Sequence, residues 1–194
     1  MHLPRSSIAD KFAGTWLAYA AFYLCRKNFS VLMPFLISSL AFSKDQLASL
    51  VFAYSLAYAF GQFLNGRLAD TLGARRVVIA GMLLSALANL FMAVLWPGSW
   101  IPVFTAFAVL QVGNGLAQSA GWPGLIKITA NTFGIERRGV LMAWWTTSLV
   151  FGGLAGTLLA TWLVTGWPAR TWPSLGWRLG AIGPAAAVVA VAFM

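Results

Sequence analysis

Six long apolar stretches make up most of this chain, and each has the length that a helix needs to cross a bilayer. They cover approximately residues 12–40, 46–68, 77–96, 102–129, 139–165 and 177–194. A transmembrane helix takes about 20 mostly apolar residues, because backbone polar groups in lipid must be satisfied within the helix itself. We therefore expect an all-α membrane protein with six transmembrane helices.

The composition excludes an ordinary water-soluble domain. Of the 194 residues, 60% are hydrophobic and 9% are charged, whereas soluble domains carry about 25% charged residues. The net charge of +9 does not indicate nucleic-acid binding, because the basic residues lie in short gaps between apolar runs. With one cysteine and one histidine, the chain offers no internal disulfide and no metal-ligand cluster, and we expect no cofactor.

Lysines and arginines in the connections predict the orientation. The side that includes the amino terminus holds Arg5, Lys11, Arg67, Arg75, Arg76, Lys127, Arg137 and Arg138. The opposite side holds only Lys44, Arg170 and Arg178, together with an interfacial belt of Trp96, Trp100, Trp162, Trp167 and Trp172. Because cytoplasmic loops carry the excess of Lys and Arg, we expect the amino terminus in the cytoplasm.

Arg26 and Lys27 lie in the middle of the first stretch, about 20 Å from either end at the helical rise per residue. Charge inside a span marks a pathway or a ligand site. Tyr19, Tyr23 and Arg26 share one helix face, and the guanidinium fork suits phosphate or carboxylate. Lys27 is expected to add positive potential or to pair with another helix. Alternatively, the span ends here and both residues lie at an interface.

Gln111, Asn114 and Gln118 recur at i, i+3 and i+7 and form a polar stripe in the fourth stretch. The stripe predicts either a cavity wall or hydrogen bonds between helices, which contribute about 0.6–2 kcal/mol each in membrane bundles. The sequence favours neither, and one stripe can do both.

The connection between the second and third stretches reads Gly66-Arg67-Leu68-Ala69-Asp70-Thr71-Leu72-Gly73-Ala74-Arg75-Arg76. It resembles the loop signature of the major facilitator transporters. Gly66 would permit close helix approach and Gly73 a sharp turn. The resemblance implies that residues 1–194 form the amino-terminal, six-helix half of such a transporter and that the carboxyl-terminal half is missing. It also implies that Asp70 helps to hold a cytoplasmic gate, with Arg137 or Arg138 as its expected partner.

The string from Tyr19 to Ser30, followed by Met33-Pro34, is similar to the first helix of the organophosphate:phosphate antiporters. The likeness continues at Tyr58-Ala59-Phe60, Gly121-Trp122-Pro123, Arg138-Gly139, Trp145 and Gly152-Gly153. It implies exchange of an organic phosphate for inorganic phosphate, with Arg26 as one of two phosphate-binding arginines and the other in the second half. The expected substrate site comprises Arg26, Tyr19, Tyr23, Lys27, Tyr58, Gln62, Gln111 and Asn114.

Two positions depart from this family. Gln62 stands where the antiporters have a lysine, and Leu149 stands where they have a histidine. Three explanations remain open. The substrate is a different anion such as a phosphonate, the protein is a transporter-like sensor that binds phosphate esters, or other residues supply the polar groups of the cavity. In the last case Gln62 and Asn65 would supply neutral hydrogen bonds beside Tyr54 and Tyr58.

The leading hypothesis is therefore a secondary antiporter of the bacterial inner membrane, whose partners are a small anionic substrate, the bilayer and a second half. The alternatives are a membrane receptor for phosphate esters, or a facilitator for a sugar or drug in which Arg26 is structural. An enzyme is not expected, because the acidic residues all lie in connections or near the amino terminus and form no catalytic constellation. These residues are Asp10, Asp45, Asp70 and Glu136.

Overall fold

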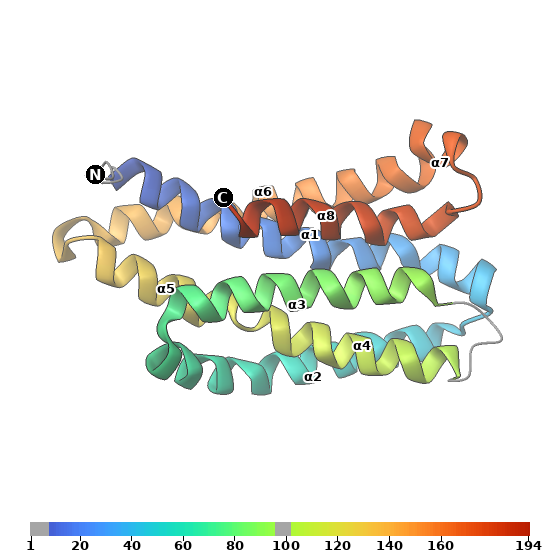
Figure 1. Cartoon of the computed structure of the whole chain (residues 1–194), viewed down its shortest axis with the longest axis horizontal. Helices are drawn as coiled ribbons and strands as arrows, with labels where there is room; N and C mark the ends of the chain where they lie inside the picture. Colours follow the sequence, from blue (N-terminus) through green and yellow to red (C-terminus); the bar gives the residue numbers. More distant parts are fainter. Residues whose placement is uncertain (1–7, 96–101) are drawn as a thin grey trace.

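The computed structural model describes residues 8–95 and 102–194, and these residues are almost entirely helical. The long helices run along one common direction, and their connections gather at the two ends of the bundle (Figure 1). The helices are α1 (Ile8–Leu40), α2 (Lys44–Leu68), α3 (Ala74–Val94), α4 (Val103–Gln118), α5 (Gly121–Thr132), α6 (Ile135–Thr165), α7 (Trp167–Thr171) and α8 (Leu179–Ala192). Two short segments complete them, the π-helical turn η1 (Ala69–Gly73) and the 3-10 turn η2 (Gly176–Arg178). The expected all-α class is confirmed.

The fourth apolar stretch, expected as one helix over 102–129, is two helices. α4 ends at Gln118 and α5 begins at Gly121, with Ser119 and Ala120 in a turn between them. Pro123 lacks the N–H that would bond to the carbonyl of Ser119, so the helical ladder is interrupted at this point. The break leaves helices of 16 and 12 residues, each shorter than the roughly 20 residues of one bilayer crossing.

Two segments of the described chain are long and apolar enough to cross a membrane, namely Lys44–Val94 and Arg138–Thr171. The first spans α2, η1 and α3 together, and Gly176–Ala192 is a shorter apolar helix. Polar residues at the middle of α1 lower its hydropathy, and the break between α4 and α5 shortens both of those helices. That the chain crosses the membrane six times therefore stays a prediction.

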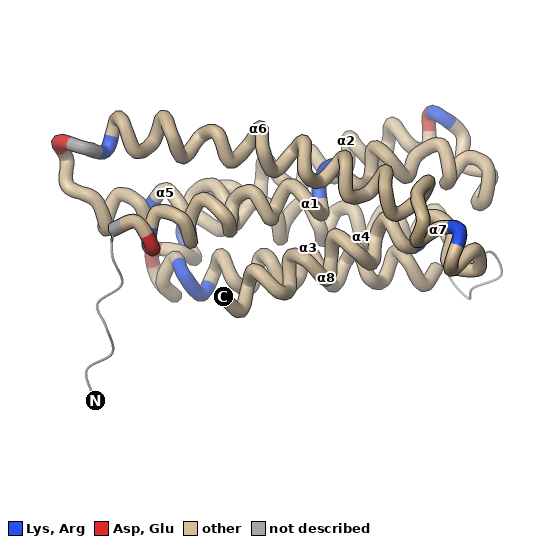
Figure 2. The backbone as a smooth tube through the Cα atoms, turned by 90° about the horizontal axis from the view of Figure 1, so that it is seen from above, with Lys and Arg blue, Asp and Glu red and all other residues tan. Residues whose placement is uncertain are grey.

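In the described parts of the chain, charged residues lie mainly at the two ends of the bundle, apart from a basic segment midway along α1 (Figure 2). The exposed side chains of Trp162, Trp167 and Trp172 lie on α6, on α7 and directly after α7. Of the residues used to predict the orientation, Arg5, Trp96, Trp100 and the side chain of Arg137 lie outside the described parts. The cytoplasmic location of the amino terminus stays a prediction.

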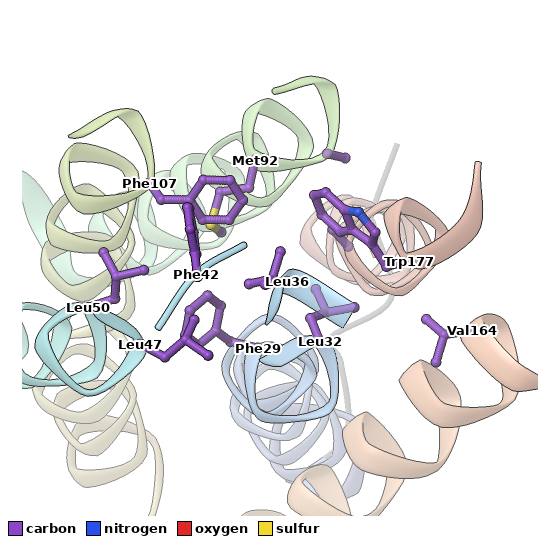
Figure 3. Close-up of a cluster of buried hydrophobic side chains, with 12 residues drawn as sticks. Phe29, Leu32, Leu36, Phe42, Leu47, Leu50, Met92, Phe107, Val164 and Trp177 are labelled. Atoms are coloured by element: carbon purple, nitrogen blue, oxygen red, sulfur yellow. The ribbon is translucent and has the colours of Figure 1, made fainter. Parts of the chain in front are cut away.

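Two apolar clusters form the core, one toward each end of the bundle. The first joins the end of α1 to the start of α2 and α4 and to η2, and it contains Phe29, Leu32, Leu36, Phe42, Leu47, Leu50, Met92, Phe107, Val164 and Trp177 (Figure 3). The rings of Phe42 and Phe107 meet edge to face at 5.4 Å. The second cluster includes Phe22, Met82, Leu125, Trp145 and Val188.

Two glycines bring α6 against the backbone of α1. A Cβ on Gly152 would lie 2.5 Å from the carbonyl oxygen of Ala20, and one on Gly156 would lie 2.8 Å from that of Tyr23. Small residues at such spacing let membrane helices approach closely. This contact fixes the position of α1 on both sides of Tyr23, directly before the charged segment.

We predict that Gly152→Ala lowers the stability of the protein by about 1–3 kcal/mol, because its Cβ would overlap the α1 backbone. Gly153→Ala is the matched control, since its Cβ would lie 3.8 Å from Lys27 Cε and Tyr23 Cδ1, an ordinary contact. Thermal unfolding in detergent would measure both variants. Equal melting temperatures for the two would contradict the close approach of α1 and α6.

Candidate functional site

Arg26 lies deep within the bundle, far from either end of its helix. It follows the start of α1 by 18 residues and precedes its end by 14, which corresponds to about 27 Å and 21 Å of helix. The helix continues without interruption through both positions. The alternative that the span ends at Arg26 and Lys27 is therefore wrong for the helix, which runs on to Leu40.

The Arg26 guanidinium is held by groups from three helices. Its Nε donates to Gln118 Oε1 of α4 at 3.1 Å. Its Cζ lies 4.7 Å from the ring centroid of Tyr23 on α1 and 4.6 Å from that of Tyr58 on α2. Such cation–π contacts contribute about 0.5–2 kcal/mol each, depending on desolvation. Nη2 is buried and has no hydrogen-bond partner within the described parts of the chain.

A cavity of about 160 Å³ lies beside this guanidinium, between α1, α2 and α4. Its walls are formed by Arg26, Lys27, Phe29, Ser30, Val51, Tyr54, Ser55, Gln111 and Asn114. Four of the predicted site residues thus border one cavity. Arg26 is half-buried, whereas Lys27 is exposed, and the Lys27 side chain passes close to Gly153 of α6.

The other predicted site residues lie around this cavity rather than on its wall. Tyr23 and Tyr58 hold the guanidinium with their rings, as described above. Tyr19 is 2% exposed and packs in an aromatic cluster, 4.6 Å from Trp145 and 5.7 Å from Tyr23 between ring centroids. Tyr19 therefore supports Tyr23 and does not reach the cavity.

Ser85 of α3 forms hydrogen bonds with two residues of the polar stripe of α4. Its Oγ donates to Asn114 Oδ1 at 2.7 Å and accepts from Gln118 Nε2 at 2.8 Å. Asn114 Nδ2 in turn donates to the carbonyl of Cys25 at 3.3 Å. Both amides are thereby fixed in orientation, with Gln118 Oε1 toward Arg26. The stripe combines its two predicted roles, because Asn114 borders the cavity and also bonds to another helix.

Asn89 and Asn28 extend this network to α8. Asn89 Nδ2 donates to the carbonyls of Ser85 at 2.9 Å and Cys25 at 3.4 Å. Asn28 Nδ2 donates to Asn89 Oδ1 at 2.8 Å and to the carbonyl of Gly180 at 3.1 Å. Sequence reasoning missed Ser85 and Asn89. Their i, i+4 spacing inside an otherwise apolar stretch was the signal that could have identified them.

The two departures from the antiporter pattern lie apart from the cavity wall. Leu149 is partly buried against the cluster that contains Trp145, and Gln62 is half-buried. Asn65, which was expected to provide neutral hydrogen bonds, donates instead to the carbonyl of Leu116 at 2.9 Å and to Ser119 Oγ at 2.7 Å. Neither Gln62 nor Asn65 borders the 160 Å³ cavity.

In the loop signature, Asp70 pairs with Lys127 of α5, which also donates to the carbonyl of Ala69 at 3.1 Å. The expectation of Arg138 as partner is wrong, and the side chain of Arg137 lies outside the described residues. Arg138 donates instead to the carbonyls of Phe133 at 2.9 Å and Ala130 at 2.5 Å. Carbonyls at a helix carboxyl end lack intrahelical donors and attract cations, so Arg138 caps α5.

The glycines of the signature differ in what they require. Gly73 has φ of +90°, a conformation that favours glycine, and it ends η1 just before α3. A Cβ on Gly66 would meet only Pro123 Cβ, at 4.0 Å, so packing leaves room there. Arg75 and Arg76 lie exposed in the first turn of α3.

Because the Asp70 side chain is 68% exposed, its pair with Lys127 contributes about 0–1 kcal/mol, and its role is to link η1 to α5.

Comparison with protein families gives a match that covers almost the whole chain. The model of the Major Facilitator Superfamily matches residues 15–194.

Individual relatives share about a third of the aligned residues. The chain is 35% identical over 143 residues to the glycerol-3-phosphate transporter of Bacillus subtilis, an alignment that covers 73% of this chain and 31% of that protein. It is 36% identical over 127 residues to the glucose-6-phosphate exchanger SLC37A2 of Bos taurus, covering 64% of this chain and 25% of the relative. The chain thus spans a third or less of the length of these two relatives.

We predict that Ser85→Ala destabilises the protein, because Asn114 loses its donor and Gln118 loses an acceptor in a buried layer. Each buried polar group left unpaired costs about 1–3 kcal/mol. Ser49→Ala is the control, since Ser49 is exposed and bonds only to the carbonyl of Gln46 in its own helix. If both variants unfold at the same temperature in detergent, the buried network does not contribute to stability.

Proposed function

The chain belongs to the Major Facilitator Superfamily, and from that premise we propose that it forms the amino-terminal half of a secondary antiporter. This antiporter exchanges an organic phosphate, or a related organic anion, for inorganic phosphate. Rocking of two six-helix halves around a site at mid-depth would expose Arg26 to each side in turn. The relatives named above, a glycerol-3-phosphate transporter and a glucose-6-phosphate exchanger, support this substrate class.

The observation that carries the proposal is the state of Arg26. It is a cation at mid-length of α1, oriented by Gln118, with a buried Nη2 that is unpaired within the described residues and borders a small cavity. A structural arginine would be expected to use its whole donor fork within the protein, because an unpaired buried charge is costly. A free donor beside a cavity is instead suited to bind an anion.

We propose further that Tyr23 and Tyr58 hold Arg26 in place, that Lys27 adds positive potential, and that Gln111 and Asn114 form the opposite wall. Tyr19 and Gln62 would act at the edge of the site. The second phosphate-binding arginine would come from a carboxyl-terminal half. The excess of basic residues at one end supports an amino terminus in the cytoplasm, and the resemblance to bacterial carriers favours a bacterial inner membrane.

A second candidate function is a sensor for phosphate esters, and the two departures from the antiporter pattern favour it. The lysine and histidine of the related antiporters are replaced by Gln62 and Leu149, so this half attracts a doubly charged anion less strongly. Such a protein would bind phosphate esters without exchanging them at an appreciable rate.

We expect the complete protein encoded by the reading frame of this chain to exchange labelled phosphate in phosphate-loaded liposomes when glycerol 3-phosphate or glucose 6-phosphate is added outside. Arg26→Ala should reduce this exchange by about a hundredfold or more, because a buried charged contact is lost. Arg26→Lys should recover only part of it, since lysine lacks the planar fork.

Arg170→Ala is the control, because Arg170 lies exposed on α7 at one end of the bundle. Binding of phosphate esters without exchange would support the sensor. If the wild-type protein shows neither binding nor exchange, the substrate is not a phosphate compound and the proposal is wrong.

A further inference from the structure

We propose that the Tyr54 hydroxyl is a direct ligand of the bound anion and donates a hydrogen bond to a phosphoryl oxygen held by Arg26. This inference rests on the proposed function and specifies how its site is built. Tyr54 belongs to α2, whereas Arg26 belongs to α1, so the two donors approach the same cavity from different helices.

The Tyr54 hydroxyl is buried and available. Its oxygen has no partner that meets hydrogen-bond geometry among the described residues, and the Arg26 guanidinium lies close enough to it for a weaker hydrogen bond. The ring stacks on Tyr58, with centroids 6.2 Å apart and planes at 24°. Because the Tyr58 ring also contacts Arg26, the position of Tyr54 relative to the guanidinium is fixed by packing.

Two unpaired donors on one small cavity indicate a ligand site. Arg26 Nη2 and Tyr54 Oη are both buried, and both residues border the 160 Å³ space. A volume of this size corresponds to about five water molecules at their share of the liquid, which accommodates a small oxyanion group. Unpaired buried polar groups are uncommon in folded proteins and call for an explanation. A ligand that accepts from both donors supplies one.

Two other polar side chains on the same wall, those of Asn114 and Ser55, are already engaged. Asn114 uses both ends of its amide, toward Ser85 and the carbonyl of Cys25. Ser55 donates to the carbonyl of Val51 in its own helix at 2.8 Å. Gln62 and Asn65, which the sequence offered as neutral donors, do not border the cavity. Among the neutral side chains on this wall, Tyr54 is the one whose buried polar atom lacks a partner within the described residues, and the geometry therefore assigns it to the anion.

The test measures binding and stability together on the complete protein in detergent. Inorganic phosphate and glycerol 3-phosphate are titrated into wild type, Tyr54→Phe and Ser49→Ala by calorimetry, and the melting temperature of each ligand-free protein is recorded. Tyr54→Phe should raise the Kd for both anions by about tenfold or more, because a hydrogen bond to a charged group is lost. Ser49→Ala should bind like wild type, since Ser49 is exposed on α2, lies off the cavity wall and bonds to the carbonyl of Gln46.

The melting temperature distinguishes a ligand from a structural hydroxyl. Because the hydroxyl is unpaired without ligand, Tyr54→Phe should leave the ligand-free protein as stable as wild type, or more stable. A lower ligand-free melting temperature would mean that the hydroxyl bonds within the protein and would overturn the inference. An unchanged Kd in Tyr54→Phe would overturn the inference about Tyr54 and leave the proposed function standing. Wild-type protein that binds neither anion would overturn both.

Discussion

A guanidinium midway along an apolar bundle determines how the neighbouring residues are arranged. A charge inside an apolar bundle has little water around it and lies far from the lipid headgroups, so the protein itself has to supply much of its stabilisation. Here Arg26 receives one amide oxygen and two aromatic ring contacts. The amide that serves it is oriented by Ser85, so a helix outside the cavity wall also takes part.

The two apolar clusters and the polar layer between them divide the bundle along its length. The cluster around Phe42 and Trp177 lies toward one end, and the cluster around Phe22 and Trp145 lies toward the other. Between them, Asn28, Asn89 and Ser85 link α1, α3 and α8 through hydrogen bonds. In lipid the hydrophobic effect does not drive helix association, so such bonds and the close contact at Gly152 carry more of the packing.

The sequence predicts what depends on a single helix and misses what depends on how helices are rotated against one another. Apolar runs gave five of the six helix ranges within a few residues, whereas the fourth range covers the two helices α4 and α5. The position of Arg26 in its run indicated a site at mid-depth. The pairing of Asp70 with Lys127 joins residues that lie 57 positions apart, and periodicity within one helix contains no information on such partners. For the same reason Tyr54 could not be preferred over Gln62, since both lie on α2 and only packing decides which one reaches the cavity.

The two cationic positions that this chain lacks relative to the antiporters affect how its site would attract and select an anion. A lysine or histidine attracts an anion over a distance comparable to the Debye length, about 8–10 Å, whereas a neutral hydroxyl acts only in contact. A site that combines the oriented Arg26 guanidinium and Lys27 with neutral donors, and lacks two further cations, would therefore depend more on the position of ligand oxygens than a site with all four cations. Electrostatic attraction mainly raises the rate of encounter, while oriented hydrogen bonds determine which ligand stays bound. Under the proposed function, Gln62 and Leu149 in place of two cations would shift this half toward the second kind of discrimination, to which a hydroxyl such as that of Tyr54 contributes.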